Sequence, residues 1–236
     1  MTRLARQQGP ETGGGEAGAG SSTPRRGLFI TFEGTDGAGK TTQIRLLAAR
    51  LRALGYEVLE TTEPGGTSIG NQIRRILLDP ANRELHKTTE LLLYFSSRAQ
   101  NVHERILPAL ERGAVVVCDR FTDSTLVYQG AGRGLGERVV RMLHEIACGA
   151  LQPDVTVYLD IDLDTGLARV QARSVDRLDG ETRDFHQSVR DAYLAMARTE
   201  SRFRVVDASP DPETVAAAVW NAIEPSLAGA PGGRRP

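Results

Sequence analysis

Residues 34–41 read GTDGAGKT and match the phosphate-binding pattern G-x-x-x-x-G-K-[ST]. The run ahead of them, 28–32, is apolar, β-branched and aromatic, which is typical of a buried strand, and 41–54 behind them has apolar residues at helical spacing. In a strand, glycine-rich loop and helix of this order, backbone N–H groups and the positive end of the helix dipole face a polyphosphate. A glycine-rich turn with a chance lysine would not explain both flanks.

The residues of this loop have expected tasks. The amine of Lys40 would contact the outer phosphates, and the hydroxyl of Thr41 would ligate Mg²⁺. We therefore predict an ATP site made by a continuous run: Gly34, Thr35, Asp36, Gly37, Ala38, Gly39, Lys40, Thr41 and Thr42.

Strand patterns alternate with helical patterns along the rest of the chain. The predicted strands are 28–32, 56–62, 114–119, 155–161 and 203–207, and the predicted helices are 41–54, 67–78, 88–111, 136–147, 163–173, 181–199 and 212–227. Such alternation predicts right-handed crossovers and a three-layer α/β/α P-loop NTPase fold with a five-stranded parallel sheet. Ligands bind at the carboxyl ends of such strands, where Glu33, Glu63, Asp119 and 160–162 fall.

Composition suits a single domain. We predict disordered tails at 1–26 and 228–236, which are rich in small and charged residues, and one domain at 27–227. The formal charge of −1, the lack of an apolar run of membrane-spanning length and the lack of a signal sequence predict a cytoplasmic protein with no nucleic-acid or membrane partner. Cys118 and Cys148 fit buried, reduced thiols, and the four histidines lack metal-ligand spacing.

A second polar pair follows the apolar run 115–118. Asp119 at the end of this strand has the layout of the carboxylate that holds Mg²⁺ in P-loop proteins, either directly or through water. Arg120 beside it could clamp a phosphate with two parallel hydrogen bonds. Taken alone, Asp119 could instead cap a turn and pair with Arg120. Together with the loop, the pair predicts a metal site of Thr41 and Asp119.

An ordered set of segments resembles the thymidylate kinase family over about 27–227. The segments are FEGTDGAGKTT at 32–42, EPGGT at 63–67, IRRILLD at 73–79, DRFTDSTLVYQGAGRG at 119–134, PDVTVYLD at 153–160 and DRLD at 176–179. The resemblance implies transfer of the γ-phosphoryl group of ATP to dTMP for dTTP synthesis, with Mg²⁺ as cofactor and a homodimer as the assembly. It also implies that Lys40, Asp36, Arg120 and Arg173 are catalytic residues.

The family's acceptor contacts can be placed on this sequence one position at a time. Asp36 matches the acid that bonds the sugar 3′-hydroxyl, Tyr94 the aromatic that stacks on thymine, and Arg98 the arginine that bonds a thymine carbonyl. Tyr94 taken alone would fit plain helix packing equally well. The full implied dTMP site is Asp36, Glu63, Arg74, Tyr94, Arg98, Arg120, Ser124, Tyr128 and Gln129.

Ala38 stands where some members of the family carry a catalytic arginine inside the loop. The resemblance then implies that a lid at about 169–180 supplies the arginine, with Arg173 on the ATP phosphates and Arg177 as the alternative register. Two departures are visible, since Thr62 replaces an arginine before EPGGT and the lid is one residue short.

Two other functions are compatible with a phosphate-binding loop. The chain could be a kinase for another nucleoside monophosphate or a nucleoside, or a non-kinase regulatory protein that binds ATP or GTP. The sequence has no N-K-x-D stretch to read guanine. A mere binder would not need an acceptor pocket beside the loop.

Overall fold

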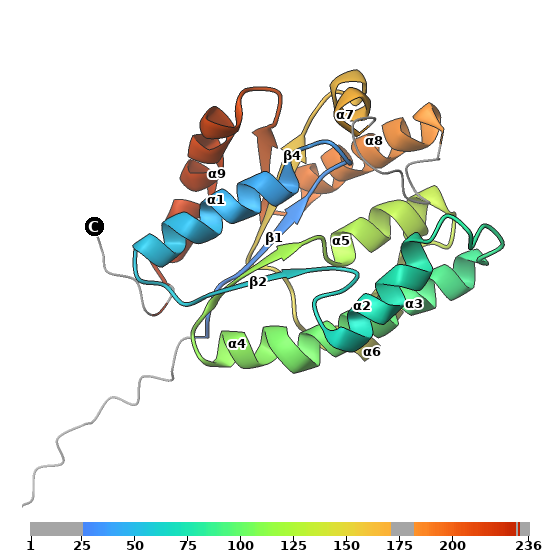
Figure 1. The fold of residues 1–236 in the computed structure, drawn as a ribbon, viewed down its shortest axis with the longest axis horizontal. Coiled ribbons are helices and arrows are strands. Elements are labelled where there is room, and N and C mark those ends of the chain that lie inside the picture. The colour runs from blue at the N-terminus through green and yellow to red at the C-terminus, as the bar shows by residue number, and fades with distance from the viewer. Residues whose placement is uncertain (1–25, 171–181, 230, 232–236) are drawn as a thin grey trace, which may run out of the picture.

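The computed structural model describes residues 26–170, 182–229 and 231. Its sheet has five parallel strands in the order β2-β3-β1-β4-β5 (Figure 1), which confirms the predicted fold class. The strands are β1 (Phe29–Glu33), β2 (Val58–Thr62), β3 (Val115–Asp119), β4 (Val155–Asp160) and β5 (Phe203–Asp207). β1 is the central strand, so the loop that follows it emerges at the middle of the sheet's carboxyl edge.

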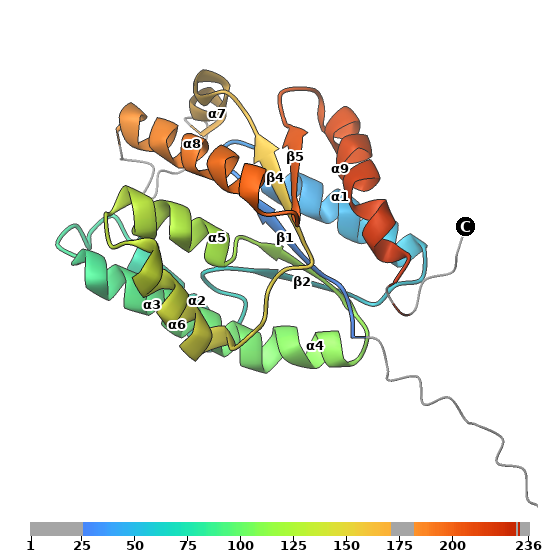
Figure 2. The ribbon, with the colours of Figure 1, turned by 180° about the vertical axis from the view of Figure 1, so that it is seen from behind.

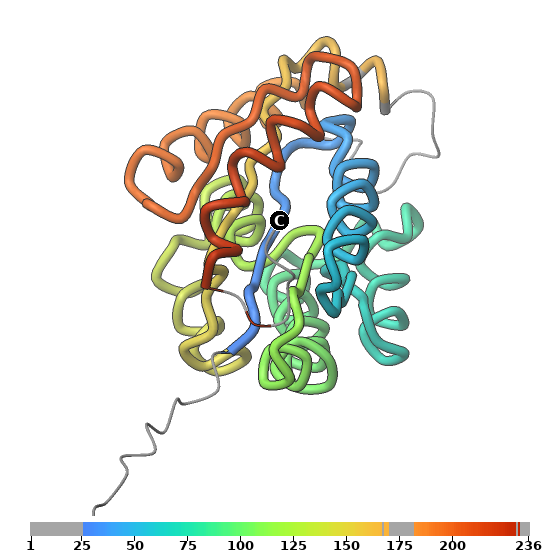
Figure 3. The backbone as a smooth tube through the Cα atoms, turned by 90° about the vertical axis from the view of Figure 1, so that its left-hand side faces the viewer, coloured from blue at the N-terminus to red at the C-terminus, as the bar shows by residue number. Residues whose placement is uncertain are grey.

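Helices cover both faces of the sheet. They are α1 (Lys40–Ala53), α2 (Ser68–Leu78), α3 (Lys87–Asn101), α4 (Leu107–Glu111), α5 (Thr122–Thr125), α6 (Glu137–Cys148), α7 (Leu163–Val170), α8 (Arg183–Thr199) and α9 (Pro212–Leu227), with π-helical segments η1 (Val102–Ile106) and η2 (Leu126–Gly132). In the side view of Figure 3, the chain leaves β1, turns at its end and runs back along it as α1.

Alternation along β1 divides its side chains between two cores, as the pleat of a strand requires. Ile30 and Phe32 belong to the core covered by α1 and α9, whereas Phe29 belongs to the core covered by α3, α4 and α6. Figure 2 shows these two groups of helices on opposite sides of the sheet. A third cluster joins α8 and η2 to β4 through Tyr158 and Tyr193. β1 is buried over its whole length, as expected for a parallel strand covered on both faces.

Many predicted element ends differ from the observed ones by one or two residues, and two segments differ more. β2 begins at Val58 rather than at residue 56. The long helix predicted at 88–111 is α3, η1 and α4 in succession. The wide turn at η1 ends two residues before Pro108, whose missing N–H cannot join the regular hydrogen-bond ladder. The stretch 122–132, for which no helix was predicted, forms α5 and η2 because tertiary burial outweighs the weak helix propensity of its Thr, Ser and Gly residues.

The tails predicted to be disordered lie mostly outside the described residues. Arg26 is described, and its guanidinium forms an ion pair with Asp154 at 2.8 Å. Cys118 and Cys148 are both free and buried. Among the described residues, no helix is long and apolar enough to cross a membrane.

His144 on α6 is a buried histidine in a defined protonation state. Its Nδ1 lies 2.8 Å from the Thr122 hydroxyl, and its Nε2 lies 2.9 Å from Nε2 of Gln152. Each ring nitrogen thus has a polar partner, and the tautomer of the ring sets which nitrogen donates. Burial, aided by the charge of Arg98, lowers the pKa of His144 to about 4.

This histidine should make the protein less stable as the pH falls from about 6.5 to about 4. In that window the unfolded chain binds a proton at residue 144 that the native chain does not bind, so the free energy of unfolding decreases with decreasing pH. Urea unfolding at a series of pH values should show a steeper decrease for the wild type than for His144→Gln. The exposed His103 supplies the control, since His103→Gln should leave the wild-type slope unchanged. Equal slopes for wild type and His144→Gln would contradict this assignment.

Candidate active site

The loop between β1 and α1 wraps around the amine of Lys40. Nζ of Lys40 donates to the carbonyl oxygens of Gly34 at 3.0 Å and Thr35 at 3.1 Å, and it lies 3.7 Å from the carboxylate of Asp36. Burial, together with the nearby charge of Arg120, lowers the pKa of Lys40. The amine is thus held at the centre of the loop, next to the N-terminus of α1.

Gly37 is required in this loop for two reasons. Its φ of 82° lies in the left-handed region, and a Cβ at this position would lie 2.2 Å from the carbonyl oxygen of Gly166 in α7. α7 therefore packs against the loop and limits its shape.

The carboxylate of Asp119 reaches the same edge of the sheet from β3. Its Oδ1 is buried and has no hydrogen-bond partner among the described residues. Both Asp119 and Thr41 line the cavity beside the loop. A carboxylate oxygen and a hydroxyl next to a phosphate-binding loop are suitable donors for Mg²⁺, so these residues fit the predicted metal site.

Arg120 has an unusual backbone and a well-defined side chain. Its φ of 67° is the only positive φ of a non-glycine residue in the described part of the chain. The guanidinium donates to Asp36 at 2.8 Å and to the Ser124 hydroxyl at 3.4 Å, and it lies over the ring of Tyr128 at 5.2 Å. The turn at β3 therefore directs a fixed cation to the phosphate loop.

Arg98 on α3 is 1% exposed and pairs with Glu63. One terminal nitrogen of its guanidinium donates to the carbonyl of Phe121 at 3.2 Å and to the Thr125 hydroxyl at 3.0 Å. The other, NH1, is buried without a partner among the described residues. Burial raises the pKa of Glu63, and the Arg98 charge opposes that rise. A ligand carbonyl would satisfy the unpaired donor.

All nine residues of the predicted dTMP site line one cavity of about 420 Å³. The same cavity is lined by Gly37, Gly39, Lys40, Thr41 and Thr42 of the predicted ATP site and by Asp119. Within it, Arg74 donates to the carbonyl of Pro64 at 2.7 Å, and the amide of Gln129 donates to Glu90 at 2.8 Å. Segments from β1 to η2 are thus brought to a single space.

Some predicted residues do not line this cavity. Gly34 and Thr35 hold Lys40 through their carbonyls, and Ala38 is buried in the core under the loop. Arg173 and Arg177 lie outside the described residues. Arg169, the only described arginine of the predicted lid, lines the cavity and donates to backbone carbonyls of Gly37, Ala208 and Ser209 at 3.2 to 3.4 Å.

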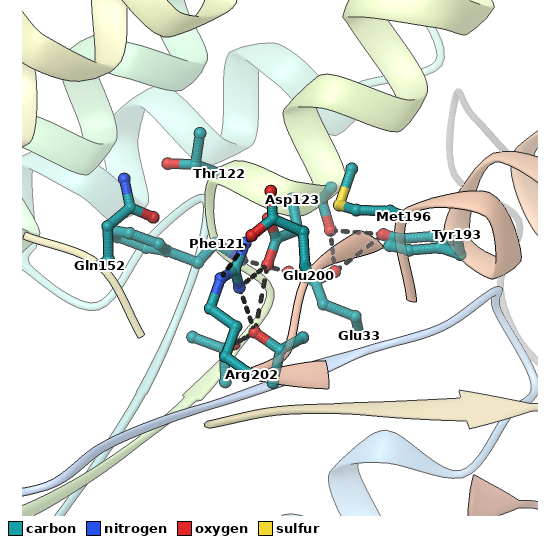
Figure 4. A network of polar contacts seen from close by, with 12 residues as sticks. Glu33, Phe121, Thr122, Asp123, Gln152, Tyr193, Met196, Glu200 and Arg202 are labelled. Carbon is teal, nitrogen blue, oxygen red and sulfur yellow. Dashed lines mark hydrogen bonds and ion pairs between the residues drawn. The ribbon is translucent and has the colours of Figure 1, made fainter. Parts of the chain in front are cut away.

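The sequence predicts Glu33 at the carboxyl edge of the sheet, directly before the loop, but assigns it no role in the site. Its carboxylate is fully buried and accepts hydrogen bonds from Tyr193, Ser124 and the backbone N–H of Phe121 (Figure 4). Burial, with the neighbouring Asp123 carboxylate, raises the pKa of Glu33 to about 7. A charged residue at the end of an otherwise apolar strand was the available signal.

Comparison with known proteins identifies the family. The thymidylate kinase family model matches residues 32–219. The thymidylate kinase of Thermomicrobium roseum is 56% identical over 198 residues, covering 83% of this chain and 93% of that protein. That of Pelobacter propionicus is 49% identical over 201 residues, covering 82% and 92%. The crystal structure of thymidylate kinase from Ehrlichia chaffeensis superposes with a TM-score of 0.70 at 30% identity, over 84% of this chain and 99% of that one. This chain therefore belongs to the thymidylate kinase family.

Proposed function

We propose that the chain transfers the γ-phosphoryl group of ATP to dTMP, giving dTDP and ADP for dTTP synthesis, and that both substrates meet in the 420 Å³ cavity. The observation that carries this proposal is the shared lining of that cavity. The phosphate loop and the nine residues expected to hold dTMP face the same space, as direct transfer between two bound substrates requires.

On the donor side, the loop and Lys40 bind the ATP phosphates. Loop N–H groups and the N-terminus of α1 supply partial positive charge, and Lys40 adds a full charge. Thr41 and Asp119 would hold Mg²⁺, which would neutralise negative charge on the ATP phosphates. Phosphoryl transfer depends mainly on positioning and charge neutralisation, which these groups provide.

On the acceptor side, Arg120 and Arg74 bind the dTMP phosphate and Asp36 bonds the sugar 3′-hydroxyl. The ion pair of 2.8 Å between Asp36 and Arg120 links these two tasks, since one carboxylate orients both the sugar and the phosphate-binding guanidinium. Ser124 and Arg120 are also in hydrogen-bond contact, at 3.4 Å. The phosphate oxygen that attacks ATP is thereby directed to the end of the loop.

The thymine ring is held by Tyr94, Arg98, Tyr128 and Gln129. The unpaired NH1 of Arg98 donates to a thymine carbonyl, and Tyr94, one helical turn earlier on α3, contacts the flat face of the ring. The assignment of Arg173 to the ATP phosphates stays a prediction from the resemblance.

A product assay tests this function. Purified protein, Mg²⁺ and ATP are incubated with dTMP, dUMP, dCMP, dAMP or dGMP in turn, and nucleoside diphosphates are separated by chromatography. We expect dTDP as the main product. A kinase of another specificity would favour another monophosphate, and a regulatory nucleotide-binding protein would form no diphosphate from any acceptor.

We further propose that the chain is a homodimer joined through α2, α3 and α6, which lie side by side (Figures 1 and 2). Val139, Met142 and Ile146 form an apolar stripe on α6 at helical spacing, and Ile146 is 78% exposed. Neighbouring α2 and α3 add exposed Ile69, Ile76 and Leu92. A continuous apolar face of this kind is typical of a subunit interface.

Met142→Glu should convert the dimer to a monomer, because it places a charge on the apolar face that the proposed dimer would bury. Size-exclusion chromatography with light scattering measures the mass directly. Val205→Glu on β5 is the matched control, since Val205 is 51% exposed and Met142 is 53% exposed. A wild-type monomer, or a Met142→Glu dimer with unchanged dissociation constant, would contradict this interface.

A further inference from the structure

Arg120 reaches the proposed acceptor site from a turn whose backbone is unfavourable for an arginine. At a φ of 67° a side chain is crowded by its own backbone, so neighbouring contacts must maintain the turn. Two hydrogen bonds enclose it. The N–H of Arg120 donates to the carbonyl of Phe32 at 2.9 Å, and the N–H of Phe121 donates to the Glu33 carboxylate at 2.8 Å. Both acceptors belong to the end of β1, directly before the phosphate loop.

The same carboxylate holds a second point of this segment. One oxygen of Glu33 accepts from the Phe121 N–H, and the other accepts from the hydroxyl of Ser124, which in turn contacts the Arg120 guanidinium at 3.4 Å. Glu33 therefore contacts the backbone after Arg120 and a side chain that touches its guanidinium. It does not line the cavity, so any effect on substrate would pass through these neighbours.

Tyr193 on α8 fixes the carboxylate itself. Its hydroxyl lies 2.8 Å from Glu33 (Figure 4) and 3.0 Å from the Ser124 hydroxyl. Its ring stacks on Tyr158 of β4, with 4.8 Å between the ring centroids. Tyr193 is fully buried, so the hydroxyl has no access to solvent as an alternative partner. Three groups from two parts of the chain, the 121–124 segment and α8, thus converge on one acidic side chain.

On the far side of α5, Asp123 anchors the segment independently. Both of its oxygens accept from Arg202, at 2.6 and 2.7 Å. α5 is thereby tied to the start of β5 without help from Glu33. Loss of Glu33 should therefore shift the Arg120 turn while α5 stays attached to the sheet.

We propose that Glu33 is a positioning residue, an inference that rests on the proposed function. Glu33 holds Arg120 toward the dTMP phosphate, and the Tyr193 hydroxyl in turn orients Glu33. Glu33→Gln replaces one acceptor oxygen by a donor nitrogen, so the amide cannot accept from Phe121, Ser124 and Tyr193 together. The variant should lose catalytic efficiency with dTMP rather than affinity for ATP, because the turn that Glu33 holds carries Arg120, the arginine proposed to bind the dTMP phosphate.

The test is a double-mutant cycle between Glu33→Gln and Arg120→Ala, with γ-labelled ATP so that slow variants give measurable rates. In the wild-type background, Glu33→Gln should lower kcat/KM for dTMP by about tenfold and leave the KM for ATP within about twofold. In the Arg120→Ala background, the same change should cost less than about twofold, since its target is already gone. Thermal unfolding of each variant reports the structural effect separately.

Tyr193→Phe provides a second variant that leaves the buried carboxyl group of Glu33 and the ring stack in place. It should lower kcat/KM for dTMP by about threefold, again only when Arg120 is present. Tyr158→Phe is the matched control, because its hydroxyl contacts Asp160 rather than Glu33, and it should not change this parameter.

The proposal for Glu33 would be overturned if Glu33→Gln lowered kcat/KM by the same factor in the Arg120→Ala background as in the wild type. It would also be overturned if the variant impaired the use of ATP and dTMP equally. If Glu33→Gln does not fold, the double-mutant cycle between Tyr193→Phe and Arg120→Ala tests the proposal by the same comparison of kcat/KM. Failure of the wild type to phosphorylate dTMP would instead contradict the proposed function, so the two failures are distinguishable.

Discussion

Lys40→Met should lower kcat by about 10²- to 10³-fold, the usual cost of removing one group that stabilises charge in the transition state. The methionine side chain has a similar length and no charge, so the loop keeps most of its packing. In the structure, the amine of Lys40 is held by the carbonyls of Gly34 and Thr35, at the centre of the loop where the ATP phosphates bind. Its charge would act most strongly on the phosphoryl group during transfer.

Steady-state kinetics for both substrates measure this effect. The KM for dTMP should change by less than about threefold, because Lys40 acts on the donor side. Lys40→Arg keeps the charge and should retain more activity than Lys40→Met. A kcat within tenfold of the wild type for Lys40→Met would show that this lysine does not stabilise the transferring group.

Arg98→Lys should lower kcat/KM for dTMP by about 10²-fold and leave the KM for ATP within about twofold. The lysine keeps a positive charge beside Glu63 but lacks the forked donors that reach Phe121, Thr125 and the cavity. Loss of a buried donor to the base should cost about 1–3 kcal/mol. Arg105→Lys is a matched control, since Arg105 also donates to a backbone carbonyl, that of Gly66 at 2.5 Å, but does not line the cavity.

Arg98→Ala should also destabilise the folded protein, which Arg98→Lys should do far less. It leaves the buried carboxylate of Glu63 without its cation, which typically destabilises a protein by about 3–5 kcal/mol. Urea unfolding should therefore separate the two variants, with Arg98→Ala far less stable than Arg98→Lys. Normal dTMP kinetics in Arg98→Lys would remove Arg98 from the base site, and equal stabilities would contradict the structural importance of its pair with Glu63.

The phosphate loop and the fold class could be predicted because their signals are local. The glycines of 34–41 and the alternation of strands with helices are visible in short windows of sequence, and the structure confirms the five parallel strands. The predicted acceptor residues came from ordered motifs, and the sheet's carboxyl edge supplies the physical reason why Asp119 and the loop lie close together.

The partners of the buried charges could not be predicted in this way. Glu63 and Arg98 are 35 residues apart, and Glu33 and Tyr193 are 160 residues apart. Such pairs depend on how helices pack onto the sheet, and no periodicity within one element specifies them. The same reason explains the helical segment at 122–132, which is held in place by contacts with Glu33 and Arg202 rather than by local propensity.

A crystal structure with dTMP, Mg²⁺ and a non-hydrolysable ATP analogue bound together tests most directly whether both substrates share one site. We expect both nucleotides in the one cavity, with the dTMP phosphate on Arg120, a thymine carbonyl on NH1 of Arg98 and the analogue's phosphates on the loop around Lys40. A dTMP molecule bound elsewhere, or bound in this cavity with its phosphate away from Arg120, would contradict this arrangement.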